Sequence, residues 1–267
     1  MHRTIPKKGL VKILKTLAIG NSFSDDATGW LHQIAKAGGI DLKAVSLCIG
    51  GCPLELHWAN ALNDERAYFV SVNGEGTEEF LSISQALQSE SYDFVTFQQG
   101  SILSGKPESY YPYIENLFHF VKAVSPDSEI LVHQTWAYEP GYERLSEYEN
   151  SSDVMFRCVK EAYALAAERL ADLNNAPIRI IPCGEAMQTA RTNPLFATTF
   201  GDGNPLSLNR DGFHASLEYG RYLLGAVWYE VFTGRGIFKN SFKPEGTDDK
   251  IIEVLKQVAH QAVMGYR

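Results

Sequence analysis

The sequence predicts an α/β fold in which a parallel sheet lies between layers of helices. Strand-like and helix-like segments alternate along the chain, which is the pattern of repeated βαβ units. Several of the strand-like segments are short continuous apolar runs, as expected for strands that are buried on both faces. The chain has 267 residues and is 45% hydrophobic, enough for one sizeable core. We therefore expect a single domain over residues 1–267.

Each expected element follows from its local sequence. The first strand is an apolar segment that ends before Gly20, and it and four later runs are expected as strands at 12–19, 43–48, 92–97, 129–134 and 177–182. The segment 159–173 is rich in Ala, Glu and Leu and is part of the expected helices, which cover about 28–38, 54–63, 79–89, 110–124, 152–173, 216–232 and 251–263. Residues 65–78 and 136–150 interrupt the alternation and are interpreted as surface excursions. Residues 193–213 predict a long loop, and such loops inside compact domains are often functional.

Composition excludes several classes of function. The net charge of −8 gives little support to a nucleic-acid partner. No apolar run is long enough to span a membrane, and residues 1–6 lack the apolar core of a signal peptide. The expected location is cytoplasmic if the chain is complete, and periplasmic or secreted if an N-terminal segment has been removed.

The four cysteines predict buried thiols rather than a metal site. Cys48 and Cys52 have the spacing of half a metal site, but no second pair of Cys or His ligands matches them. A disulfide remains an open alternative. We expect no metal and no organic cofactor.

Polar and glycine residues follow successive strands at the same edge of the expected sheet. Ser22 follows the first strand, Gly51 the second, and Gln98 and Gln99 the third. In a parallel sheet, ligands bind outside the carboxyl ends of the strands. The 193–213 loop is expected to bring His214 to the same edge.

Ser22, Asp211 and His214 have the residue types of a nucleophilic triad. Serine needs a general base, and the base needs an orienting acceptor. The three-residue spacing predicts that Asp211 folds back to accept a hydrogen bond from Nδ1 of His214, which leaves Nε2 facing Ser22. The alternative is ordinary: Ser22 caps the following helix, and Asp211 and His214 belong to a surface turn.

Several other residues allow both a functional and a structural interpretation. The N–H of Gly51 and a side-chain amide of Gln98 or Gln99 suit the stabilisation of an oxyanion, although a tight turn and polar strand ends explain them equally. Trp136 and Tyr138 line either a substrate cleft or the core. His57 lies on an expected helix and His133 at the end of an expected strand, and a structural role is favoured for His57.

These blocks resemble the SGNH (GDSL-like) hydrolase superfamily. Residues 19–24 (IGNSFS) are similar to its first block, 49–52 (IGGC) to its second and 211–214 (DGFH) to its last. The third block departs, because this chain has FQQGS at 97–101 where many members carry an Asn in G-x-N-D. With the segments 54–57 (LELH) and 135–138 (TWAY), the combination looks like an uncharacterised bacterial subfamily.

The resemblance implies a three-layer α/β/α fold, similar to flavodoxin, with a parallel sheet of about five strands. It implies hydrolysis of a small-molecule or carbohydrate ester through an acyl-enzyme on Ser22, with His214 as base and Asp211 as its orienting group. The oxyanion donors are then the N–H groups of Ser22 and Gly51 and the amide of Gln99.

The leading expectation is a carboxylester hydrolase, with carbohydrate O-acetyl groups as the suggested substrate. One alternative is a carbohydrate-binding protein that keeps the fold without turnover. A less favoured alternative is a metal-dependent phosphoesterase that uses Asp25, Asp26, His57 and His214.

Overall fold

The computed structural model describes residues 13–266 and contains a seven-stranded sheet in the order β4-β3-β2-β1-β5-β6-β7. The neighbouring strands β2, β1, β5, β6 and β7 pair in parallel, whereas β3 pairs antiparallel with β2 and β4 pairs antiparallel with β3. The strands are β1 (Leu14–Gly20), β2 (Leu42–Cys48), β3 (Tyr68–Val72), β4 (Glu75–Leu81), β5 (Phe94–Phe97), β6 (Glu129–His133) and β7 (Arg179–Ile181).

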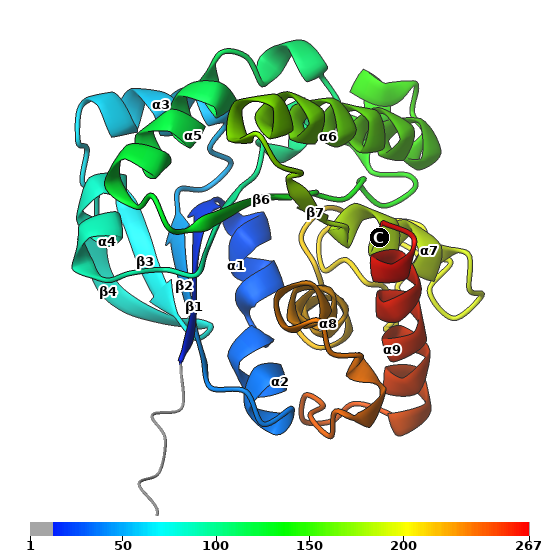
Figure 1. Ribbon diagram of the computed structural model, residues 1–267. Coiled ribbons are helices and arrows are strands. Elements are labelled where there is room, and N and C mark those ends of the chain that lie inside the picture. The colour runs from blue at the N-terminus through cyan, green and yellow to red at the C-terminus, as the bar shows by residue number, and fades with distance from the viewer. Residues whose placement is uncertain (1–12, 267) are drawn as a thin grey trace, which may run out of the picture.

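Helices cover both faces of this sheet (Figure 1). The layer with α3, α4, α5 and α6 lies on one face, and α1, α2, α8 and α9 lie on the other, with α7 packed against α8 and α9. Their bounds are α1 (Ser22–Thr28), α2 (Leu31–Ala37), α3 (Leu54–Leu62), α4 (Ile83–Ser89), α5 (Tyr113–Val124), α6 (Ser152–Asn174), α7 (Cys183–Arg191), α8 (Tyr219–Thr233) and α9 (Asp249–Met264). The predicted α/β/α sandwich is therefore confirmed.

The order of the parallel strands places a topological switch point between β1 and β5. Numbered along the chain, the five parallel strands have the flavodoxin-like order 2-1-3-4-5, in which the chain reverses direction across the sheet between β1 and β5. The loops after these two strands diverge there, which is where such sheets bind ligands. Ser22 follows β1 and Gln98 follows β5 at this point.

The core explains the apolar runs in the sequence. Leu17, Ala18 and Ile19 of β1 are buried because helices cover both faces of this central strand. Helix α8 is apolar on nearly all sides, and most of its residues are buried. Figure 1 shows it between α1, α2 and α9. Helices α5 and α9 instead bury one stripe each.

Several expectations about the elements were wrong. Residues 65–78 are not only a surface excursion, because they include β3 and most of β4, a hairpin that extends the sheet beyond the expected five strands. Residues 136–139 are buried rather than on the surface. Helix α7 lies where no helix was expected. The helix expected at about 28–38 is α2, which begins at Leu31, and a separate helix, α1, precedes it from Ser22.

None of the helices within residues 13–266 combines the length and the apolar character needed to cross a bilayer.

Candidate functional site

Ser22 occupies the sharp turn between β1 and α1. Asn21 is the extended N-cap of α1, and its side-chain oxygen accepts a hydrogen bond from the N–H of Phe23 at 3.0 Å. This cap makes Ser22 the first residue of the helix. Gly20 is required because a Cβ at that position would overlap Ser24 Oγ and lie 2.9 Å from Gln98 Oε1.

Asp211 and His214 form a local turn that points the imidazole at Ser22. Asp211 Oδ1 accepts from the backbone N–H of His214 at 2.8 Å, and Asp211 Oδ2 lies 2.7 Å from Nδ1 of His214. The other ring nitrogen, Nε2, lies 2.8 Å from Ser22 Oγ. A continuous line of hydrogen bonds thus joins Asp211, His214 and Ser22, although the chain places 192 positions between the serine and the histidine.

The surroundings keep the carboxylate ionised. Partial burial of Asp211 opposes its charge, but hydrogen bonds from the ring and the backbone N–H of His214 outweigh that effect. The pKa of Asp211 is therefore lowered from its usual value. At neutral pH the carboxylate accepts a hydrogen bond from Nδ1–H, and this fixes Nε2 as the nitrogen that accepts a hydrogen bond from the serine hydroxyl.

Gly51 lies in a turn that is attached to the residue before Ser22. The N–H of Ile49 donates to the carbonyl of Gly20 at 3.3 Å, and the side-chain amide of Asn21 donates to the carbonyl of Cys52 at 3.2 Å. Gly51 is exposed and has φ of 66°, a left-handed conformation that favours glycine. The structure therefore brings the Gly51 turn beside the start of α1.

Gln99 does not have the surroundings expected of an oxyanion donor. Its side chain is completely buried, and both hydrogen bonds of its Nε2 go to Ser109, to the carbonyl at 2.9 Å and to Oγ at 3.0 Å. Its Oε1 accepts from the N–H groups of Leu54 and Gly100 at 2.9 and 2.8 Å. The expectation for Gln99 is corrected: these contacts give the amide a structural role between the β5 exit, α3 and the loop at Ser109.

Gln98 connects the interior polar groups behind Ser22. Its Nε2 donates to Asn21 Oδ1 at 2.6 Å, and its Oε1 accepts from Ser24 Oγ and lies 3.2 Å from Nδ1 of His133. Burial lowers the pKa of His133 to about 3, so this ring is neutral. Sequence reasoning missed this network, because only the packed sheet brings the ends of β1, β5 and β6 together.

Trp136 and Tyr138 are core residues and not cleft residues. Both are completely buried. The indole of Trp136 stacks on Phe23 with ring centroids 4.1 Å apart, and its Nε1 donates to the carbonyl of Phe213 at 2.7 Å. Tyr138 Oη pairs with Ser101 Oγ at 2.9 Å.

Other aromatic rings lie at the surface beside His214. The half-exposed ring of Phe213 lies 3.9 Å from the imidazole, centroid to centroid, and stacks on Tyr142 at 5.6 Å. Phe200 packs edge-on against Tyr142 and is 45% exposed. These three rings, which the sequence reasoning did not single out, form the aromatic surface next to the imidazole.

The residues of the expected metal alternative do not converge. Asp26 is buried and paired with two arginines, and His57 is buried with Nδ1 2.8 Å from Tyr68 Oη. Burial lowers the pKa of His57 to about 3. Within residues 13–266, no group of three or more His, Cys, Asp or Glu side chains is placed to hold a metal ion.

The cysteines are free thiols; Cys52 and Cys183 are buried as predicted, whereas Cys48 and Cys158 are only partly buried. Burial raises the pKa of Cys52 to about 12.

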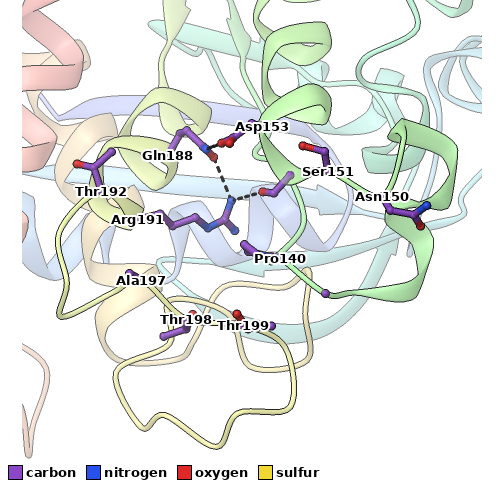
Figure 2. Close-up of a pocket in the computed structure, with 12 residues that line it drawn as sticks. Pro140, Asn150, Ser151, Asp153, Gln188, Arg191, Thr192, Ala197, Thr198 and Thr199 are labelled. Atoms are coloured by element: carbon purple, nitrogen blue, oxygen red, sulfur yellow. Dashed lines mark hydrogen bonds between the residues drawn. The ribbon is translucent and has the colours of Figure 1, made fainter.

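A cavity of about 460 Å³ opens at the start of α6, where Figure 2 shows Arg191 reaching from α7 toward the helix end. Arg191 donates to Ser152 Oγ at 3.2 Å and, at 2.9 Å each, to the carbonyl of Ala137 and to Asn209 Oδ1. Loss of hydration lowers the pKa of Arg191 to about 10, which still leaves it charged at neutral pH. Because Asn209 pairs with Ala215, this arginine supports the base of the turn that carries His214.

Comparison with known proteins gives a family and a fold. Residues 15–262 match a domain of unknown function, DUF4886. The crystal structure of a DUF4886 family protein from Bacteroides uniformis is 34% identical and has a TM-score of 0.84, with 95% of each chain covered. No curated protein matches the sequence.

More distant structures share the fold. A protein from Slackia heliotrinireducens that has been assigned to the SGNH hydrolases is 21% identical with a TM-score of 0.54, over 82% of this chain and 98% of that one. The acetyl xylan esterase AlAXEase is 12% identical with a TM-score of 0.51, over 82% of this chain and 99% of that one.

Proposed function

We propose that this chain, which belongs to the DUF4886 family, is a carboxylester hydrolase that works through an acyl-enzyme on Ser22. The observation that carries the proposal is the hydrogen-bonded line from Asp211 through His214 to Ser22, with separations of 2.7 and 2.8 Å. Such a line is what a serine needs to act as a nucleophile near neutral pH. The fold shared with SGNH-type hydrolases and esterases is consistent with this chemistry.

The proposed reaction has two halves. Ser22 Oγ attacks the ester carbonyl carbon while Nε2 of His214 takes its proton, and Asp211 stabilises the resulting imidazolium. The imidazolium then protonates the leaving alcohol, which leaves the acyl group on Ser22. Water attacks the acyl-enzyme with the same nitrogen as base, and the acid and free Ser22 are released.

The oxyanion formed in each half requires donors that are fixed before the reaction. We assign the backbone N–H groups of Ser22 and Gly51. The first N–H groups of a helix have no partner inside the helix, and the Gly51 turn is bonded to Asn21 beside Ser22. Gln99 is omitted from this assignment because its amide is engaged with Ser109.

We extend the proposal to acetyl esters of carbohydrates. His214 protonates the leaving alcohol, so the alcohol part of the substrate lies on the side of Phe213, Tyr142 and Phe200. Exposed aromatic faces suit the apolar face of a sugar ring. The fold shared with an acetyl xylan esterase supports the same class. Faster release of acetate from acetylated xylan or acetylated monosaccharides than from alkyl acetates is the expected result.

The test is turnover of p-nitrophenyl acetate by the wild type, by Ser22→Ala and by Ser89→Ala, an exposed serine on α4 that serves as control. Ser22→Ala is expected to lower kcat by about 10⁴-fold or more, and Ser89→Ala to have no effect. A fluorophosphonate should attach to Ser22, as located by peptide mass spectrometry. Undiminished activity in Ser22→Ala refutes the mechanism. Loss of wild-type activity with a chelator favours a metal-dependent phosphoesterase. Binding of carbohydrate without turnover favours a carbohydrate-binding protein.

A further inference from the structure

Asp26 is a buried carboxylate that lies one helical turn after Ser22 on α1. It has no exposed surface, and it contacts two arginines from distant parts of the chain. Arg210 Nη1 donates to both carboxylate oxygens at 3.0 and 2.9 Å. Arg221 of α8 donates from Nε to Oδ1 at 2.9 Å, and its Nη2 lies within ion-pair distance of the same oxygen at 2.9 Å. The carboxylate also accepts from the backbone N–H of Ala215 at 3.0 Å.

Two of these partners are the residues that flank the turn from Asp211 to His214. Arg210 directly precedes Asp211, and Ala215 directly follows His214. The turn is closed on itself, because the N–H of Arg210 donates to the carbonyl of His214 at 3.0 Å and its guanidinium donates to the carbonyl of Ala215. Both ends of the turn that carries the imidazole therefore attach to one carboxylate on the helix that carries the serine.

The chemistry of these contacts makes the attachment rigid. A buried carboxylate is stable only when opposite charges and hydrogen bonds replace its lost hydration, and here two guanidinium groups and one N–H do so. Planar guanidinium groups bind carboxylate with defined direction as well as distance. The proposed reaction does not use the charge of Asp26. The desolvation cost of this buried carboxylate therefore indicates that it has another role.

We propose that Asp26 is a positioning residue that sets the separation of Ser22 Oγ and His214 Nε2 by holding the turn at Arg210 and Ala215 against α1. This inference rests on the proposed function. A catalytic base misplaced by about 1 Å lowers the rate by about 10²-fold. Loss of the Asp26 contacts is therefore expected to reduce kcat while substrate binding is retained.

The experiment compares Asp26→Asn with Glu230→Gln in p-nitrophenyl acetate hydrolysis. Glu230 is the matched control, because it is also a buried carboxylate, 1% exposed, that accepts from the N–H of Ile237 at 2.7 Å and pairs with His260 at 3.0 Å. We expect Asp26→Asn to lower kcat by about 10²-fold with KM changed by less than about threefold, and Glu230→Gln to keep both constants. Wild-type kcat in folded Asp26→Asn, or an equal loss in Glu230→Gln, overturns the proposal.

Two further measurements keep the test decisive. If Asp26→Asn does not fold, the experiment uses Arg210→Gln instead, because Arg221 still pairs with Asp26 in that variant. A loss of about tenfold or more in kcat supports the proposal, and a wild-type kcat overturns it. Crystal structures of the variants report the separation of Ser22 Oγ and His214 Nε2 without reference to activity. A separation beyond hydrogen-bond range supports positioning and an unchanged 2.8 Å overturns it, even if an inactive wild type has already refuted the proposed function.

Discussion

Replacement of Gln99 by alanine should destabilise the protein without removing its catalytic power. In the structure its Oε1 is the acceptor for the N–H groups of Leu54 and Gly100, at 2.9 and 2.8 Å. Gln99→Ala leaves both groups buried without this acceptor, and each unsatisfied group costs about 1–3 kcal/mol. The free energy of unfolding should therefore fall by about 2–6 kcal/mol, a large part of the 5–15 kcal/mol that is typical of a domain.

Urea unfolding followed by circular dichroism measures this loss as a lower midpoint at unchanged slope. The kcat of the folded enzyme should stay within about threefold of the wild type. Gln88→Ala, on the exposed surface of α4, is the control and should change neither quantity. If Gln99→Ala instead keeps the wild-type midpoint and its kcat falls by about 10²–10³-fold, the Gln99 amide donates to the oxyanion and the structural role assigned to it is wrong.

The remaining predictions concern charge, loop support and thiols. The pKa of Asp211 is lowered in the folded state, so its ionisation stabilises the protein above the unfolded pKa of about 4, and this contribution should disappear as the pH falls through the folded pKa. Asp211→Asn should therefore show a smaller decline in urea midpoint over this acid range than the wild type. An identical decline would contradict the assignment. Trp136→Phe removes the indole donor to the carbonyl of Phe213. This change should lower the unfolding free energy by about 1–3 kcal/mol and slow ester hydrolysis, which parallel unfolding and kinetic assays will measure. Burial raises the thiol pKa of both Cys52 and Cys183, so at pH 8 their alkylation by iodoacetamide should be much slower in the native than in the urea-unfolded chain, as mass spectrometry of the labelled peptides will show.

The sequence alone determined the parallel part of the fold and the local geometry of the turn from Asp211 to His214. Apolar runs separated by helical segments require strands buried on both faces, and this predicted all five parallel strands to within a few residues. The spacing of Asp211 and His214 was sufficient to predict their contact, because three residues of a turn bring the two side chains together without help from the rest of the chain. The β3–β4 hairpin escaped prediction because β4 is an edge strand of mostly exposed residues that lacks an apolar pattern.

Only the tertiary structure decided which polar and aromatic side chains face solvent. Adjacent residues at a strand end point in different directions, so the roles of Gln98 and Gln99 depended on which neighbours each met. For Trp136 the sequence left a cleft position and a core position open, and packing against Phe23 buries the ring in the core. The pairing of Asp26 with Arg210 joins residues 184 positions apart, and no local pattern encodes such a contact, since it forms only when the layers of the fold pack together.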